Sequence, residues 1–362
     1  MPANGNVADD TGETPETIEC AVPPEHTGRR LDQSLAELLP DRSRAFLQKL
    51  LEDGLVLMDG APRKASRKVK GGERVLVRIP PPEPLSLEPE NLPLSVLHED
   101  GDLIVIDKRP GMVAHPSPGH ADGTLVNALL HHYGESLSAI GGVLRPGIVH
   151  RLDKGTSGCL VAAKNDRAHS ALMRQFTSRE VEKTYLAITE GAPRPLEGRV
   201  EVRIGRNPRD RRFHAVLPNG GRRSVTRYRT LENYGALALV RCDLETGRTH
   251  QARVHLAHLG APVLCDRDYG RRQVYTVADA ADALALYRTG RPAGLHHRNP
   301  RPILARQALH AWKLAFTHPA TGERMAFTAP LPPDMADVLI PLRKARAEMD
   351  AAPRDDVGAF GV

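Results

Sequence analysis

A polar segment of thirteen residues, Pro146–Gly158, holds the densest set of reactive side chains in the sequence. It contains His150, Arg151, Asp153 and three glycines, and it leads into the apolar run 159–163, which predicts a strand. Polar residues on a loop that a strand holds in place are typical of active sites. A carboxylate such as that of Asp153 can act as a nucleophile or as a general base, and the sequence leaves both roles open.

The order of these residues argues against phosphoryl transfer. The kinase catalytic loop reads His-Arg-Asp with a later Asn, whereas a Leu separates Arg151 from Asp153 here. The sequence contains neither a DFG motif nor the glycine-rich loop of kinases, and it has no Walker A motif. Protein kinases and P-loop nucleoside triphosphatases are therefore excluded.

The segment HRLDKGTSG at 150–158 resembles the signature loop of the RluA-type pseudouridine synthases. Other segments match the same family, namely HPSPGHADGTLVNALLHHY at 115–133, EKTY at 182–185, LETGRTHQ at 244–251 and ALH at 308–310. The resemblance extends over residues 28–342 and is to members that act on large-subunit ribosomal RNA. It implies an isomerase that detaches uracil from ribose C1′, rotates it and reattaches it through C5.

The resemblance also implies roles for single residues. Asp153 would be the essential catalytic carboxylate, Arg248 would pair with it, and Tyr185 would pack against the uracil with its hydroxyl near C5. Arg151 would take part in flipping the target base out of the RNA stack. This chemistry needs no redox cofactor, so we expect no cofactor and no metal.

Two other functions remain as alternatives. A non-catalytic RNA-binding factor in ribosome assembly could keep the same fold, but the presence of Asp153, Tyr185 and Arg248 argues against it. A glycoside hydrolase usually needs two carboxylates about 5–10 Å apart. The motif around Asp153 supplies only one.

Residues 28–81 predict a small α/β domain. Apolar spacing indicates helices over 31–39 and 43–53, and short strands follow at 55–58 and 74–79. Between residues 28 and 78, twelve basic residues outnumber seven acidic ones, a composition that suits phosphate binding. The pattern resembles the S4 RNA-binding module, which implies RNA contacts by Arg29, Arg30, Arg42, Arg44 and Lys49.

A proline-rich linker, 82–94, separates this domain from a predicted catalytic domain at 95–343. Helices are expected at 124–133, 166–177 and 249–259, and strands at 103–108, 159–164, 182–188, 225–231 and 236–244. Several strands follow one another without a crossover helix. This favours an α+β fold with a mixed, mainly antiparallel sheet and a central cleft. Residues 271–306 are interpreted as a long surface insertion.

An arginine-rich segment lies between residues 201 and 229, where nine arginines face two acids. It is interpreted as two strands joined by a loop with its turn at 219–221. Strand alternation places Arg223, Val225 and Arg227 on one side, so we expect Arg223 and Arg227 to form a patch along RNA phosphates.

The two ends of the chain are predicted to be tails. Residues 1–27 carry six acids and no Lys or Arg, which indicates an acidic disordered tail, and 344–362 are interpreted as a charged tail. The four cysteines are scattered and fit a reducing compartment, and no apolar run is long enough to span a membrane. We therefore expect a cytoplasmic monomer whose partner is large-subunit ribosomal RNA or a ribosomal precursor particle, with no membrane attachment.

Overall fold

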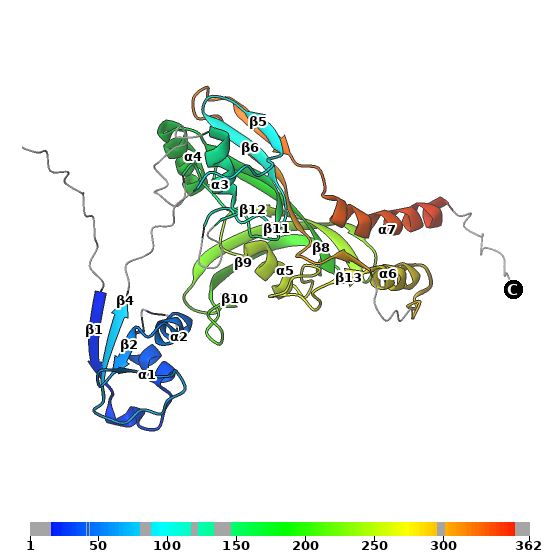
Figure 1. Ribbon diagram of the computed structural model, residues 1–362. Coiled ribbons are helices and arrows are strands. Elements are labelled where there is room, and N and C mark those ends of the chain that lie inside the picture. The colour runs from blue at the N-terminus through cyan, green and yellow to red at the C-terminus, as the bar shows by residue number, and fades with distance from the viewer. Residues whose placement is uncertain are drawn as a thin grey trace, which may run out of the picture. The chain divides into compact units, whose positions relative to one another are not determined.

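The computed structural model describes residues 16–40, 42, 44–79, 88–116, 122–133, 146–294 and 301–351 (Figure 1). The chain divides into two compact units, residues 1–86 and 87–362, which are described separately below. The division falls inside the predicted linker 82–94, of which 82–87 lie outside the described residues.

The first unit is a four-stranded antiparallel sheet with two helices packed together. Leucines at helical spacing on both helices and valines on the strands share one core. The helices form where that spacing predicts them, and the sheet order is β1-β4-β2-β3. The elements are β1 (Glu16–Ala21), a 3-10 turn (Pro24–His26), α1 (Leu31–Leu38), α2 (Arg44–Glu52), β2 (Val56–Met58), β3 (Ala61–Pro62) and β4 (Arg74–Ile79).

The prediction of a disordered tail over residues 1–27 is wrong for residues 16–27. Strand β1 pairs along its whole length with β4. Its alternate residues Ile18 and Cys20 pack against the core of the unit, and Val22 is 2% exposed. Because a strand needs only one apolar face, acidic residues on the other face do not prevent it from forming. Residues 1–15 lie outside the described part.

The second unit is built on a ten-stranded sheet of order β10-β9-β11-β12-β8-β15-β7-β6-β5, with β16 paired to β15 (Figure 1). All neighbours are antiparallel except β7 and β15, so the predicted mixed, mainly antiparallel α+β fold is confirmed. The strands are β5 (Val96–Glu99), β6 (Leu103–Lys108), β7 (Ser157–Ala163), β8 (Glu182–Glu190), β9 (Glu197–Arg206), β10 (His214–Leu217), β11 (Arg222–Asn233), β12 (Leu237–Leu244), β15 (Leu309–Thr317) and β16 (Arg324–Thr328).

Helices cover this sheet with their apolar faces. Helix α3 (Leu125–Tyr133) packs on one face of β6 and β7, and α4 (Asp166–Ser178) packs on the other. The side chain of Asn165 caps the start of α4 by accepting from the backbone N–H of Ala168. Helix α5 (Gln251–His258) belongs to a second core with β8 and β12. Among the described residues, no helix is long and apolar enough to cross a membrane.

The segment 271–306 is more than the predicted surface insertion. Strands β13 (Tyr275–Thr276) and β14 (Pro302–Leu304) pair, and α6 (Val277–Thr289) lies between them in the chain. Helix α6 begins at a capping box in which Thr276 and Asp279 satisfy each other's backbone N–H groups. Tyr275 and Leu304 are 1% and 2% exposed because they join the core of the second unit.

The predicted boundary at 343 and the tail from 344 are also wrong in part. Helix α7 (Pro333–Ala351) continues through 344–351 and packs against α6. Leu342 and Ala345 are 1% and 0% exposed on its inner face. The charged residues of this stretch occupy the outer face of an amphipathic helix, which resembles a polar tail in composition alone. Residues 352–362 lie outside the described part.

The arginine-rich segment forms three strands where two were predicted. Strand β10 returns along the outer edge of β9, and β11 then pairs with the other edge of β9. The chain crosses at Gly221, whose φ is +67° and where a Cβ would lie 2.8 Å from the carbonyl oxygen of Ile204. Only glycine fits this crossing without strain.

Two buried histidines make stability sensitive to acid. His255 and His310 are 1% and 0% exposed, and burial lowers the pKa of each to about 4. In the unfolded chain they titrate near 6.5, so between these values the unfolded chain binds more protons, and stability falls as pH falls. Each of these two histidines lowers the free energy of unfolding by about 1.4 kcal/mol per pH unit in this window, so together they should account for a loss of about 4 kcal/mol between pH 7 and pH 5. Burial also lowers the pKa of His150, to about 3, so the total loss should be larger.

The measurement is the free energy of unfolding in urea at pH 7 and pH 5. His255→Leu serves as the control, because the nitrogens of His255 have no hydrogen-bond partner in the described part of the chain. Between the two pH values this variant should lose about 2 kcal/mol less than the wild type. Equal free energies of the wild type at both pH values would contradict the prediction.

Candidate active site

A cavity of about 540 Å³ opens in the second unit. Its walls come from the loop before β7, the end of α4, the start of β8 and the loop between β12 and α5. The structure thereby brings together residues from distant parts of the chain. All four predicted catalytic and substrate residues line it, namely Arg151, Asp153, Tyr185 and Arg248.

The loop that carries Asp153 is held by backbone contacts. The N–H of Thr156 donates to the carbonyl oxygen of Asp153 at 2.9 Å. Gly158 follows at the start of β7 with a φ of +110°, and a Cβ there would lie 2.2 Å from the carbonyl oxygen of Ala311. This glycine therefore lets β7 approach β15 closely, which fixes the end of the loop.

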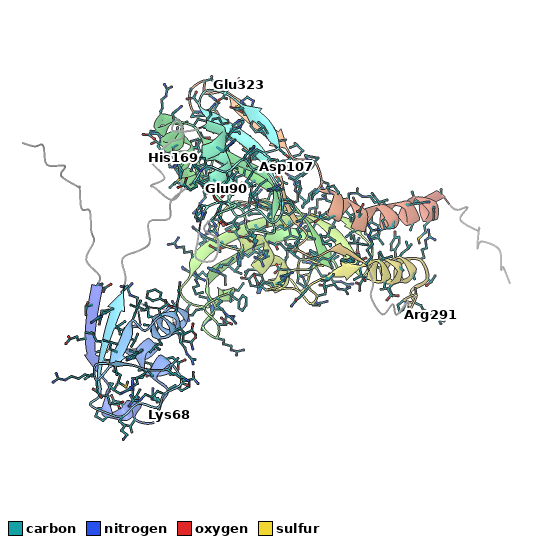
Figure 2. All side chains as sticks on the ribbon, viewed as in Figure 1. Lys68, Glu90, Asp107, His169, Arg291 and Glu323 are labelled. Atoms are coloured by element: carbon teal, nitrogen blue, oxygen red, sulfur yellow. The ribbon has the colours of Figure 1, made fainter. Side chains whose placement is uncertain are left out.

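Lys108, at the end of β6, supports the same loop with hydrogen bonds from its ammonium group. It follows Asp107, labelled in Figure 2, and is 1% exposed. Its Nζ donates to the carbonyl oxygens of Arg109 and Met112 at 2.9 Å and to that of Lys154 at 3.4 Å. Burial lowers the pKa of Lys108 to about 7, and the nearby Asp153 opposes this shift. No sequence motif marks Lys108, which stands at the end of the predicted strand 103–108.

The carboxylate of Asp153 pairs with Arg253. Nη1 of Arg253 donates to Oδ2 of Asp153 at 3.1 Å. The guanidinium is 4% exposed and is also bound by Asp266 at 2.6 and 2.7 Å and by Asp268 at 2.6 Å. Arg253 is thus a preorganised cation beside a carboxylate that faces the cavity.

The predicted pair of Asp153 with Arg248 is therefore wrong. Arg248 lies on the loop before α5, and its Nε donates to the carbonyl oxygen of Arg223 at 3.2 Å. Arg253 lies in the first turn of α5, where the helix faces the cavity. The signal that could have found it is an arginine between the apolar Ala252 and Val254 in the predicted helix 249–259, which the structure buries.

Tyr185 stands on β8 with its ring half-buried in the cavity wall. Burial raises the pKa of its hydroxyl, and the negative charge of Asp153 raises it further. The phenol therefore stays protonated at neutral pH next to the carboxylate. His150 also lines the cavity, but its Nε2 accepts from the N–H of Val161 at 3.0 Å and its ring stacks on Phe176.

His250 is a second neighbour of Asp153 that the sequence analysis did not select. Its Nε2 lies 3.8 Å from Oδ1 of Asp153, and its Nδ1 is hydrogen-bonded to the hydroxyl of Tyr269 at 2.9 Å. The residue has a φ of +56°, a conformation that costs energy for a side chain of this size. The backbone at the start of α5 thus holds the imidazole toward Asp153.

Six of the seven predicted RNA-binding residues, all of them arginines, form ion pairs with acids. Arg223 and Arg227 on β11 bind Glu201 and Glu245 at 2.6 and 2.8 Å. In the first unit, Lys49 is exposed, and the arginines pair with acids: Arg29 with Glu37, Arg30 and Arg44 with Asp32, and Arg42 with Glu16. Lys68, labelled in Figure 2, forms an isolated antiparallel β-bridge with Arg30. Contact of these residues with RNA stays a prediction.

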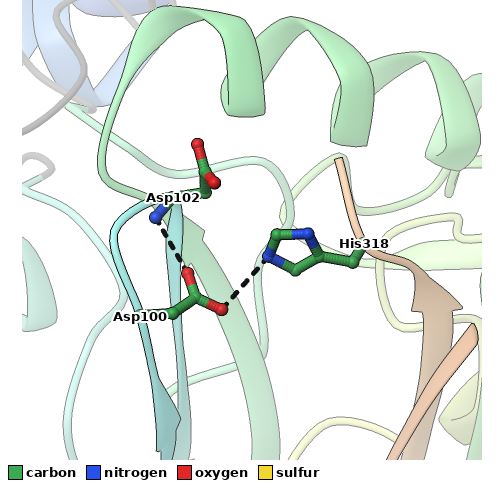
Figure 3. Close-up of side chains that lie close together, drawn as sticks. All are labelled: Asp100, Asp102 and His318. Atoms are coloured by element: carbon green, nitrogen blue, oxygen red, sulfur yellow. Dashed lines mark hydrogen bonds and ion pairs between the residues drawn. The ribbon is translucent and has the colours of Figure 1, made fainter. Parts of the chain in front are cut away.

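One group in the described ranges has the spacing of a metal site, namely Asp100, Asp102 and His318 (Figure 3). Oδ1 of Asp100 accepts from the N–H groups of Asp102 and Leu103, and Oδ2 binds Nε2 of His318 at 3.1 Å. Nδ1 of His318 accepts from two backbone N–H groups, so the proton of the neutral ring is on Nε2. The three residues therefore connect two loops by hydrogen bonds, and Nε2 of His318 has no lone pair to offer a metal.

Comparisons with known proteins show the family to which the chain belongs. Residues 102–258 match the RNA pseudouridylate synthase family, and residues 29–75 match the S4 domain. An uncharacterized RNA pseudouridine synthase of Chloroflexus aurantiacus is 47% identical over 88% of this chain and 91% of its own. Another, YlyB of Bacillus subtilis, is 40% identical over 90% of this chain and 98% of its own.

The chain belongs to the RNA pseudouridine synthases of the RluA type, which are RNA isomerases, and carries an S4 domain in its first unit. A relative with a more specific name is the ribosomal large subunit pseudouridine synthase D of Nitrosomonas europaea. It is 44% identical over 91% of this chain and 89% of its own.

Proposed function

We propose that the protein converts uridines of large-subunit ribosomal RNA to pseudouridine, with Asp153 as the catalytic carboxylate. The observation that carries the proposal is the Asp153 carboxylate, 20% exposed in the cavity and paired with the buried Arg253. The name of the Nitrosomonas relative supports the choice of RNA. Target uridines like those of synthase C are the second candidate, and a cytoplasmic monomer remains our expectation.

The reaction breaks the bond between N1 of uracil and C1′ and forms one between C5 and C1′, after which C5 loses its proton. Asp153 either adds to C1′ or removes a ribose proton, and both roles need the ionised carboxylate. Arg253 orients this carboxylate through the hydrogen bond from its Nη1. Tyr185 orients the detached base by packing its ring against it and by offering its protonated hydroxyl as a hydrogen-bond donor.

The test of the proposal is pseudouridine mapping by carbodiimide adducts and primer extension. Large-subunit RNA is incubated with the protein, both free and in assembled subunits. We expect new stops at a few uridines, and their positions separate targets of the D and C kinds. Absence of stops on both substrates, with RNA binding retained, would contradict the proposal and favour a non-catalytic assembly factor.

RNA binding by the S4 domain is proposed to depend on a buried acid. Asp32 is 0% exposed and accepts from Arg30 at 2.9 Å and from Arg44 and Gln48 at 2.6 Å. Burial acts to raise the pKa of Asp32, but these hydrogen bonds hold it at about 2. The carboxylate thus fixes two guanidinium groups at the surface, which lowers the entropy they lose on binding phosphate.

We expect Asp32→Asn to weaken binding of an RNA stem-loop about tenfold, although the change removes a negative charge and so raises the net charge of the protein by one. Glu37→Gln makes the same charge change at an exposed ion pair with Arg29 and should tighten binding slightly. Affinity is measured by fluorescence anisotropy, and circular dichroism checks the fold. Tighter binding by both variants would show that Asp32 acts through charge alone.

A further inference from the structure

Three arginines lie close enough to act on one another, and two of them line the cavity of Asp153. Arg179 follows the end of α4, Arg248 lies between β12 and α5, and Arg222 begins β11; these three are called the arginine rim. Arg179 and Arg248 line the cavity. The hydrogen bond from Nε of Arg248 to the carbonyl oxygen of Arg223 holds its guanidinium next to the start of β11.

The arginine rim differs from its neighbours in its partners. On the adjoining strands, Arg199 binds Glu201 at 2.5 Å and Glu245 at 3.4 Å, and the same two acids also bind Arg223 and Arg227. Within the described ranges, no carboxylate forms an ion pair with any member of the arginine rim. The acids of this surface therefore neutralise one set of arginines and leave the other uncompensated.

The uncompensated charges act on one another. Burial lowers the pKa of Arg248, and the positive charges of Arg222 and Arg179 lower it further. Burial and Arg179 likewise lower the pKa of Lys183, which also lines the cavity. Like charges this close are unfavourable in the protein alone, and an anion among them relieves the repulsion.

The backbone at Arg179 is a separate indication. This residue caps the C-terminus of α4 with a φ of +67°, a position where glycine or asparagine is preferred. A residue with a Cβ costs energy there. The fold thus accepts a strained position for a guanidinium group at the cavity wall, and strain of this kind is characteristic of functional sites.

We propose that the arginine rim binds a phosphodiester group of the RNA strand whose target uridine enters the Asp153 cavity. Guanidinium groups match phosphate oxygens through paired N–H donors, and the carbonyl contact leaves both Nη atoms of Arg248 available to the RNA. The inference rests on the proposed function. It assigns Arg248 to the RNA backbone, so this residue positions the substrate and does not touch Asp153.

The test compares variants that each remove one positive charge. Arg179→Gly and Arg222→Gln remove members of the arginine rim, and Arg199→Gln is the matched control on the same sheet. Affinity for a fluorescein-labelled RNA stem-loop with uridines in its loop is measured over a salt titration. Each rim variant should lose affinity roughly threefold to tenfold and reduce the slope of log affinity against log salt by about 0.7 to 1. The control should keep the wild-type slope.

Arg179→Gly separates RNA binding from folding. Because glycine adopts a φ of +67° without strain, this variant should melt at or above the wild-type temperature while its RNA affinity falls. A structural role of Arg179 would instead lower the melting temperature.

Wild-type slopes in both rim variants would overturn the inference. An equal loss in Arg199→Gln would also overturn it, in favour of a diffuse positive field. Pseudouridine mapping of large-subunit RNA with the wild-type protein runs in parallel. A wild type that binds the stem-loop but makes no pseudouridine contradicts the proposed function, whereas the slopes judge the arginine rim by themselves.

Discussion

Asp153→Asn is expected to lower pseudouridine formation by about four orders of magnitude or more, as when other essential catalytic groups are removed. The amide has nearly the shape of the carboxylate, but it is neither a nucleophile of comparable strength nor a base. The variant should fold normally, because Arg253 keeps Asp266 and Asp268 as partners. RNA affinity should change by less than about threefold, since the cationic surfaces are untouched.

Single-turnover release of tritium from 5-tritiated uridine in RNA measures this loss directly. The matched control is Asp268→Asn, which makes the same change on another carboxylate bound to Arg253. Asp268 is 31% exposed, so its loss should reduce the rate far less. Substantial turnover by Asp153→Asn would remove Asp153 from the catalytic role under either mechanism.

Arg253→Gln is expected to lose both stability and activity. The side chain of Arg253 is 5% exposed, and its guanidinium faces three carboxylates. One of these belongs to Asp266, whose side chain is 0% exposed. Removing the cation leaves a buried carboxylate without its charged partner, which typically costs about 3–5 kcal/mol. Turnover should fall as well, because Asp153 loses the contact that orients it.

A double variant distinguishes the two effects. Asp266→Asn together with Arg253→Gln removes the buried charge as well as its partner, so it should recover part of the lost free energy of unfolding. Turnover should stay low, because Asp153 still lacks Arg253. Urea unfolding and single-turnover rates are the measurements. A single variant as stable as the wild type, or a double variant with restored turnover, would contradict this account of Arg253.

The control Arg248→Gln connects this prediction with the arginine rim. Arg248 lies five residues before Arg253, and in the described part of the chain it forms no ion pair with a carboxylate. We expect it to weaken RNA binding while leaving the free energy of unfolding nearly unchanged. The two arginines thus separate into one that supports Asp153 and one that meets the RNA.

The local sequence determined the helices, the strands and the loop that carries Asp153, because these depend on residues near one another in the chain. The apolar spacing in 31–39 and 166–177 placed helices α1 and α4, and alternation placed β6 and β8, because periodicity reflects a buried face directly. The loop at 150–158 and its resemblance marked Asp153 as the candidate carboxylate. Composition was misleading at 16–21 and 344–351, where acidic or charged stretches form the outer faces of a strand and a helix.

Only the tertiary structure decided which charges meet. Arg248 and Arg253 stand five positions apart, and it is the start of α5 at Gln251 that turns Arg253 toward Asp153. In the same way, the pairing of β9 with β11 brings Glu201 to Arg223. Sequence specifies local conformation through nearby residues, but ion pairs join residues far apart in the chain, and their geometry is set by how the elements pack.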